Sequence, residues 1–515
     1  MKHWKRALAG VLCAASVLTC MAGCSGKKTT SGDPAASGDG EKDYPVIRLM
    51  QHRMTPESCA DEALIEEELN KIFREKCGCE VDIVFMNFGD VPDKLNLMLT
   101  GGEDSLDIFS SLTFSSTGVM AANGQILDIT PYMDNELKDT KALFDDYPGV
   151  LACGQVDGKQ YGLPSITGWT SPNIYGCKIS YADNAGVDLS QVTTMDELTE
   201  ALIKMKEASP DTYFIPASTH PYWWPKGMDY LGDQSYLGVL TDPANSTTIE
   251  NYYESDLFLN HLENVKIWQE KEIILPDGMS NGMDAGAFMA VENGLTAGST
   301  GYAQDLEEWL FEVNTNHTYG DEEIVGCYVN ERYLTSGNVA TYMWHVTPFS
   351  DYPSEACKVL NELYTNPEAS MLLVNGIEGK HYEIDENGQL TYPEGVTAET
   401  SGWYSGFGGM YEPNAMITPT WDYQLADLNE RYEQGNREAI ASLALGFTAD
   451  VEPVADQVAA CQNVIDQYYL PLINGCVDID TVLPEFQAAL KDAGIDDIIA
   501  CKQEQLDAWL ASNNG

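Results

Sequence analysis

Basic residues are scarce in this chain. It has 28 lysines and arginines against 80 aspartates and glutamates, which gives a formal net charge of −52 over 515 residues. Nucleic acids and acidic membrane surfaces carry negative phosphates and bind positively charged surfaces. The composition therefore argues against both as partners, predicts high solubility, and indicates that most carboxylates face solvent.

Motifs of several enzyme classes are also missing. The sequence has no HExxH, no GxSxG, no P-loop and no G-x-G-x-x-G after a strand. Neither a CxxC pair nor neighbouring histidines give zinc spacing. Paired carboxylates, which glycosidases use, carry no information among 80 acidic residues. We therefore expect no catalysis and no cofactor, with an envelope glycosidase as an alternative.

The first residues form a secretion signal. Residues 1–6 are basic, residues 7–19 are apolar but too few to span a bilayer, and Met21-Ala22-Gly23 precede Cys24. This segment resembles a bacterial lipoprotein signal, although Met21 stands where that pattern usually has leucine. We expect residues 1–23 to be a signal peptide and Cys24 to carry a lipid; an ordinary signal followed by a chance cysteine is the alternative.

Residues 24–43 contain almost no large apolar side chain, so they cannot form a core. We expect them to be a flexible tether that holds residues 44–515 on the extracellular face of the cell membrane. Ten cysteines follow the tether. Cys77 and Cys79 are too close in sequence to bond to each other, and we expect mostly buried thiols, with one or two disulfides as an alternative.

The periodicity of apolar residues indicates an α/β fold. Residues 46–50, 81–85 and 106–109 are strand-like, whereas residues 57–76 and 91–99 have helical spacing. This alternation predicts a mainly parallel sheet whose ligand-facing edge lies at the carboxyl ends of the strands. The polar residues that follow the first and third strands are therefore ligand candidates, namely Gln51, His52, Ser110 and Ser111.

Further elements follow. Asp157-Gly158 indicates a hairpin turn, and helical spacing is found at residues 194–209, 257–271, 454–469, 481–493 and 498–511. Residues 339–346 are strand-like and precede a helix that begins near Pro353. Residues 383–394 have the offsets of a calcium loop, but Glu383 replaces the usual aspartate, and a hairpin turn at Asn387-Gly388 is the simpler interpretation.

The order of several short segments resembles that of the extracellular solute-binding proteins, family 1, the lipoprotein components of carbohydrate-type ABC importers in Gram-positive bacteria. The segments are the lipobox, residues 107–111 (DIFSS), 157–164 (DGKQYGLP), 352–382 and 469–509. The resemblance implies a two-lobed, periplasmic-binding-protein-like α/β fold with a hinge and a ligand cleft between the lobes. It places the crossings near residues 164–174, 337–348 and 395–410, with lobe one at 44–165 plus 340–400 and lobe two at 166–339 plus 401–515.

Aromatic rings that stack on sugar rings, and planar polar groups that pair with hydroxyls, are what a carbohydrate cleft requires. The loop and crossing residues of this kind are Trp169, Trp223, Trp224, Trp344, His345, Trp403 and Tyr404. For each of them, packing within its own lobe is the alternative.

We expect a monomer that captures a carbohydrate, more specifically an oligosaccharide, and delivers it to ABC permease subunits. A peptide-binding member of the same fold is the main alternative.

Overall fold

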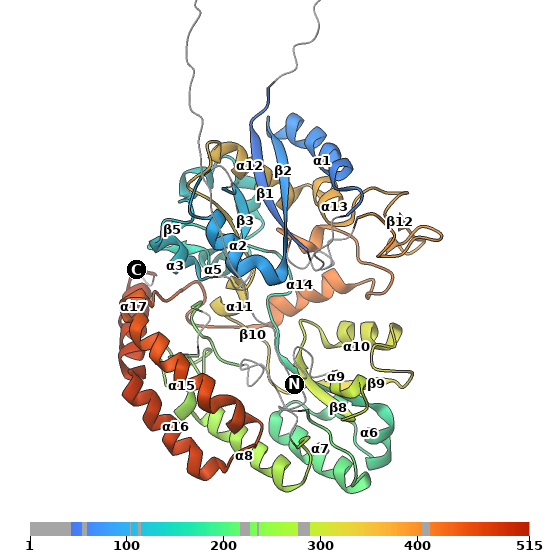
Figure 1. Ribbon diagram of the computed structural model, residues 1–515, viewed down its shortest axis with the longest axis vertical. Helices are drawn as coiled ribbons and strands as arrows, with labels where there is room; N and C mark the ends of the chain where they lie inside the picture. The colour runs from blue at the N-terminus through green and yellow to red at the C-terminus, as the bar shows by residue number, and fades with distance from the viewer. Residues whose placement is uncertain are drawn as a thin grey trace, which may run out of the picture. The chain divides into compact units, whose positions relative to one another are not determined.

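The computed structural model describes residues 43–53, 59–102, 105–111, 115–216, 227–233, 236–276, 289–403 and 412–513. Residues 44–515 form one compact unit. In this unit, two separate sheets, each flanked by helices, form two lobes joined by several passages of the chain (Figure 1). This is the two-lobed α/β architecture that the sequence predicts.

Lobe one is built on a five-stranded sheet with the order β2-β1-β3-β11-β6. Its strands are β1 (Val46–Arg53), β2 (Glu80–Asn87), β3 (Ile108–Ser110), β6 (Leu163–Pro164) and β11 (Met343–Val346). β1 runs parallel to both β2 and β3, as the alternating pattern predicts. β11 arrives from far along the chain and pairs antiparallel with β3 and β6.

Both faces of this sheet are covered. Ile47 and Leu49 of β1 belong to a core cluster with Phe73 of α1, whereas Met50 packs with Leu95 of α2 on the other side. Side chains of a strand alternate between faces, so a strand with apolar residues on both must be buried on both. The helices of this lobe are α1 (Glu62–Lys76), α2 (Val91–Met98), α3 (Thr117–Ala122), α4 (Lys138–Ala142), α5 (Pro148–Ala152), α12 (Pro353–Thr365) and α13 (Pro367–Asn375).

Lobe one also contains two small hairpins. β4 (Gln155–Val156) and β5 (Lys159–Gln160) are joined by Asp157 and Gly158, both with positive φ, which confirms the predicted Asp-Gly turn. β12 (Glu383–Ile384) and β13 (Leu390–Thr391) form the second hairpin. The Asp385 carboxylate there accepts hydrogen bonds from the backbone of Asn387 and Gln389, so residues 383–394 contain a hairpin, as the simpler interpretation predicts.

Lobe two has an antiparallel sheet of β8 (Gly298–Tyr302), β7 (Asn173–Lys178) and β9 (Ile324–Tyr328), with β7 in the middle. The side chain of Thr194 accepts from the Glu197 amide and starts a helix in a capping box at the predicted position. The helices of this lobe are α6 (Ile179–Ala185), α7 (Met195–Ala208), α8 (Asp256–Glu270), α9 (Met289–Glu292), α10 (Leu306–Thr315), α15 (Ala455–Ile473), α16 (Ile479–Ala493) and α17 (Ile495–Asn513).

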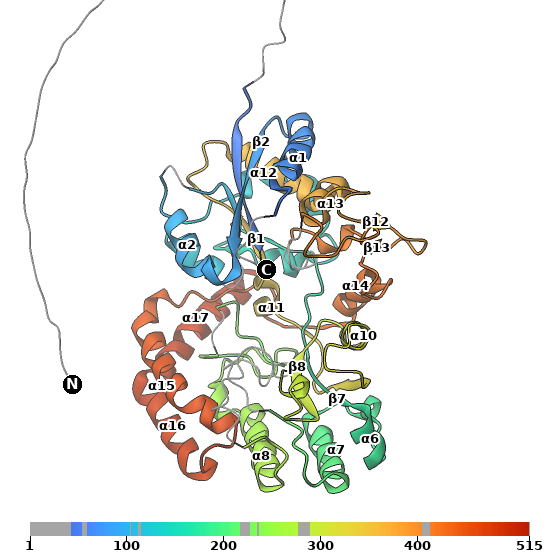
Figure 2. The same ribbon diagram turned by 45° about the vertical axis from the view of Figure 1, so that its right-hand side comes forward.

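The chain passes between the two lobes three times. The first passage, residues 165–172, joins β6 to β7, and the second, residues 329–342, joins β9 to β11. The third passage, residues 412–450, carries α14 (Leu428–Glu438) and β14 (Ile440–Ala441). β14 pairs with β10 (Tyr333–Leu334) of the second passage, and both Figure 1 and Figure 2 show α14 at the level of the passages.

One predicted element is wrong. Residues 339–346 do not form one strand, because α11 (Ser336–Ala340) occupies the beginning and only β11 is extended. The hydroxyl of Thr335 accepts from the Asn338 amide and caps α11, a local signal that the apolar run conceals. The predicted helix at 57–76 begins later, at Glu62; residues 57 and 58 lie outside the described part of the chain.

Two large core clusters follow the two sheets. The cluster of lobe one draws on residues between Ile47 and Leu373 together with Trp403, and that of lobe two on residues between Tyr175 and Ile498. The lobe boundaries given above remain a prediction. Within the described part of the chain, the free thiols include Cys77, Cys79, Cys153, Cys177, Cys327, Cys357, Cys461 and Cys501. Among the described helices, none combines the length and apolarity needed to cross a membrane.

Candidate ligand-binding site

A row of side chains crosses the carboxyl edge of the lobe-one sheet. Gln51 lies beside Phe85 of β2, and Ser110 of β3 lies beside Trp344 of β11. The pairing of Leu49 with Ile108, continued two residues along both strands, puts Gln51 beside Ser110. Three of the predicted site residues, Gln51, Ser110 and Trp344, thus share one face of the sheet.

A carboxylate from the third passage meets this row. Gln51 Nε2 donates a hydrogen bond to Glu412 Oε1, and the sequence offered no signal for this long-range pair. Glu412, Gln51, Ser110 and Trp344 are each at most 4% exposed, so these groups are covered in the structure. Burial raises the pKa of Glu412 to about 7, against the opposing effect of the Gln51 hydrogen bond.

Several polar atoms of this region have no hydrogen-bond partner within the described residues. They are Ser110 Oγ, Glu412 Oε2, Trp344 Nε1 and Trp403 Nε1. A buried polar atom without a partner costs about 1–3 kcal/mol, so groups of this kind are suited to pair with water or with ligand hydroxyls. Trp403 lies edge-on to Phe85, with ring centroids 5.6 Å apart, and is therefore close to the row.

The predicted histidines are buried and neutral. Burial lowers the pKa of His52 to about 3 and that of His345 to about 4. His345 Nδ1 is 2.9 Å from the carbonyl oxygen of Tyr161, and its ring packs against Phe109. Ser111 Oγ donates to the Met343 carbonyl. His345 and Ser111 thus contact neighbouring groups of lobe one, and a ligand role for either residue stays a prediction.

Trp169 is also packed within lobe one. Its Nε1 donates to the Ser165 carbonyl at 2.8 Å, and its ring packs against Tyr147 and Phe144 in the lobe-one core. Trp169 therefore anchors the first passage from within the core. Trp223, Trp224 and Tyr404 lie outside the described residues, as does Cys24.

A pocket lies where the first two passages enter lobe two. Tyr230 and Tyr236 stack at 5.8 Å with an interplanar angle of 26°, and Tyr333 of the second passage joins them. The remaining lining residues are Ser171, Pro172, Gly227, Met228, Asn330, Glu331, Thr335 and Asn338. Aromatic faces beside amides, hydroxyls and one carboxylate are the groups that a carbohydrate site requires.

Backbone geometry fixes this pocket. Gly337 of α11 lies so close to the Tyr230 ring that a Cβ there would be 2.3 Å from it. Asn330 Oδ1 accepts from the Asn173 amide at 2.7 Å, which joins the second passage to the beginning of β7. The passages therefore hold the tyrosines in place through contacts between residues far apart in the sequence.

The sequence predictions did not include Tyr230, Tyr236 or Tyr333. The predicted aromatic loop, with Trp223 and Trp224, continues through Gly227 to Tyr236, so its composition was a usable signal for two of the three tyrosines. Within the described ranges, no three histidine, cysteine or acidic side chains are grouped so that they could hold a metal ion.

Comparisons with known proteins agree with this architecture. The sequence model of the bacterial extracellular solute-binding proteins matches residues 57–318, and a domain family of unknown function, DUF3502, matches residues 443–511. The chain is 26% identical over 523 residues to a carbohydrate ABC transporter substrate-binding protein of Streptococcus pneumoniae serotype 4, and the match covers 99% of both chains.

Solved structures are similar as well. The N-glycan transport solute binding protein NgtS of Streptococcus pneumoniae has a TM-score of 0.76 and 23% identity, over 91% of this chain and 100% of that one. A solute-binding protein of Bifidobacterium longum infantis, described as binding HMO, has a TM-score of 0.63 and 16% identity, over 92% of this chain and 100% of that one. These structures share the fold described above. The family match spans just over half of the chain, and the protein belongs to the bacterial extracellular solute-binding proteins.

Proposed function

We propose that this protein captures an oligosaccharide outside the cell and delivers it, unmodified, to the permease subunits of an ABC importer. The pocket with Tyr230, Tyr236 and Tyr333 carries the proposal, because it places aromatic side chains beside amides and hydroxyls, the groups that suit the C–H face and the hydroxyl groups of a sugar. The name of the S. pneumoniae relative and the glycan ligands named for similar structures support a carbohydrate.

The proposed site has two halves. The tyrosine pocket belongs to the passages and lobe two, and the row with Gln51, Ser110 and Glu412 belongs to the carboxyl edge of lobe one. A ligand that contacts both halves favours a closed arrangement of the lobes over an open one. In this proposal the protein acts as a monomer, and a lipid on Cys24 holds it at the membrane.

Binding is tested by thermal unfolding and calorimetry of the purified protein. The panel contains high-mannose and other N-glycan fragments, fructo-oligosaccharides, milk oligosaccharides and short peptides. A ligand that binds only the folded state raises the unfolding midpoint. A selective rise with one class of oligosaccharide, recovered intact, supports the proposal. A rise with peptides alone, or cleavage of the sugar, contradicts it.

The site is tested with Tyr333→Ala. Loss of one stacking ring should weaken oligosaccharide binding about tenfold or more, which corresponds to about 1.4 kcal/mol. The matched control is Tyr352→Ala, because Tyr352 is exposed at the start of α12 in lobe one and is not part of the pocket lining. Equal affinities of the two variants would remove Tyr333 from the site.

A further inference from the structure

Asp305 connects two of the three passages to lobe two. It precedes α10, and its Oδ1 accepts from the Glu308 amide and so caps that helix. Arg431 of the third passage donates through Nε to Oδ1 at 3.0 Å, and Arg332 of the second passage donates to Oδ2 at 3.4 Å. Two arginines from separate passages thus meet on one carboxylate.

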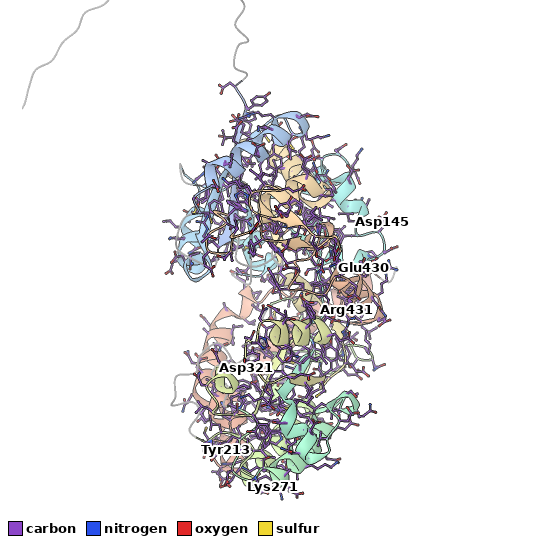
Figure 3. All side chains as sticks on the ribbon, turned by 90° about the vertical axis from the view of Figure 1, so that its right-hand side faces the viewer. Asp145, Tyr213, Lys271, Asp321, Glu430 and Arg431 are labelled. Carbon is purple, nitrogen blue, oxygen red and sulfur yellow. The ribbon has the colours of Figure 1, made fainter. Side chains whose placement is uncertain are left out.

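The Asp305 carboxylate is largely buried, which strengthens its ion pairs with the two arginines. The Asp305 side chain is 6% exposed, and Arg332 and Arg431 are 25% and 24% exposed. Ion pairs fully in water contribute little, but solvent screens a largely buried carboxylate much less. Figure 3 shows Arg431 at the level of the passages, on the ribbon of α14.

The residues on either side of Asp305 extend the connection. Gln304 Nε2 donates to the Gly168 carbonyl in the first passage, and Glu308 Oε2 accepts from the Leu425 amide in the third. Asn436 of α14 accepts from the Trp169 amide at 2.7 Å and donates to the Thr167 carbonyl at 2.8 Å. All three passages are therefore tied to the first turn of α10, directly or through α14.

Close packing leaves the first passage little freedom at this point. A Cβ on Gly168 would be 3.0 Å from the Tyr432 ring of α14 and 3.2 Å from Gln304. This cluster therefore holds the passages against the first turn of α10 in lobe two, next to the point where Trp169 anchors the first passage in lobe one.

We propose that Asp305 is a positioning residue for ligand capture, which holds the second and third passages on α10 and so limits the range of angles that the lobes sample. This inference rests on the proposed function for its binding readout but has a readout without ligand. Loss of the carboxylate charge should loosen the passages, and the arrangement that accepts ligand should become less populated. The apparent affinity falls in proportion to that population.

The test uses Asp305→Asn, which keeps an oxygen acceptor for the Glu308 amide. We expect affinity for oligosaccharides to fall about three- to tenfold, through slower association, with little change in dissociation, because the pocket contacts are unchanged. The factor should be the same for every ligand that the wild type binds. Tyr333→Ala, in contrast, should change the ranking of ligands, because it removes a direct contact.

The matched control is Asp90→Asn, which breaks the exposed pair with Lys94 on α2 in lobe one. Arg431→Gln is the second variant should Asp305→Asn not fold, and the same uniform loss is expected. Unchanged affinity in the folded variants, or a loss that differs from ligand to ligand, overturns the proposal.

Small-angle X-ray scattering of the ligand-free protein separates this inference from the proposed function. Asp305→Asn should broaden the distribution of interatomic distances relative to the wild type and to Asp90→Asn. An unchanged distribution overturns the positioning role. Failure of every sugar to bind the wild type, with a broadened distribution in Asp305→Asn, contradicts the proposed function alone.

Discussion

Glu412 is a buried carboxyl whose surroundings favour its neutral, protonated form. Its main partner is the neutral amide of Gln51, and burial raises its pKa from 4.5 to about 7. A carboxyl with a raised folded-state pKa retains its proton in the folded protein at a pH where the unfolded chain has lost it. The folded protein is therefore favoured by this group at low pH, and that advantage is lost as the pH rises toward 7.

We predict that Glu412→Gln flattens the pH dependence of stability. Between pH 5 and pH 8 the wild type should lose about 1–3 kcal/mol of unfolding free energy through this carboxyl, at 1.36 kcal/mol per pKa unit. Glutamine keeps an oxygen that can accept from Gln51 and has no proton to lose. Urea denaturation at several pH values measures the difference.

The control for this measurement is Glu386→Gln, in the exposed turn of the β12–β13 hairpin. Parallel pH profiles of the wild type and Glu412→Gln would contradict the assignment of a raised pKa to Glu412.

At the scale of elements, α17 is bound to lobe two by a buried ion pair. Lys502 Nζ lies 2.6 Å from Asp233 Oδ2, both side chains are fully buried, and Nζ also donates to the Gly238 carbonyl. Leu506, one turn further along α17, packs with Leu231 and Phe447. The C-terminal helix thereby fixes the loop that carries Tyr230 and Tyr236.

Lys502→Met should destabilise the protein by about 3–5 kcal/mol, because Asp233 is left as a buried charge without its cation. Chemical denaturation followed by circular dichroism measures the loss. The control is Lys491→Met, whose pair with Asp496 spans 3.8 Å between exposed side chains and should contribute less than about 1 kcal/mol. Equal effects would contradict a structural role for the buried pair.

Elements defined by local pattern were predictable from the sequence. The helix after Thr194 and the turn at Asp157-Gly158 depend on residues that are neighbours in the chain, and both lie where predicted. The site was less accessible to prediction. Gln51 and Ser110 were found because strand ends meet at one edge, but Glu412 reaches Gln51 from 361 residues away. The fold places Tyr230 and Tyr333 in the lining of one pocket, and no local pattern encodes that arrangement.

For the whole molecule, charge is the dominant property. A net charge of −52 means that carboxylates repel one another over most of the surface. Repulsion within a compact structure lowers its stability, and added salt screens it, with a Debye length of about 10 Å at 0.1 M.

We predict that the unfolding midpoint rises when sodium chloride increases from 50 to 500 mM at constant pH. Differential scanning calorimetry measures the shift. A fall would mean that the exposed ion pairs, such as Lys94 with Asp90, contribute more to stability than the repulsion removes.

Each lobe has its own buried cysteine thiols, whose reaction with an alkylating reagent can report local unfolding of that lobe. Lobe one holds Cys77, Cys79, Cys153 and Cys357 in its core, and lobe two holds Cys177, Cys327 and Cys461. Burial raises the pKa of Cys153 and Cys177 to about 12. Alkylating reagents react with the thiolate. These thiols therefore react only when the core of their lobe unfolds locally and exposes them. Timed alkylation followed by peptide mass spectrometry would therefore measure the rate of local unfolding of each lobe separately, in the unmodified chain and without an engineered label.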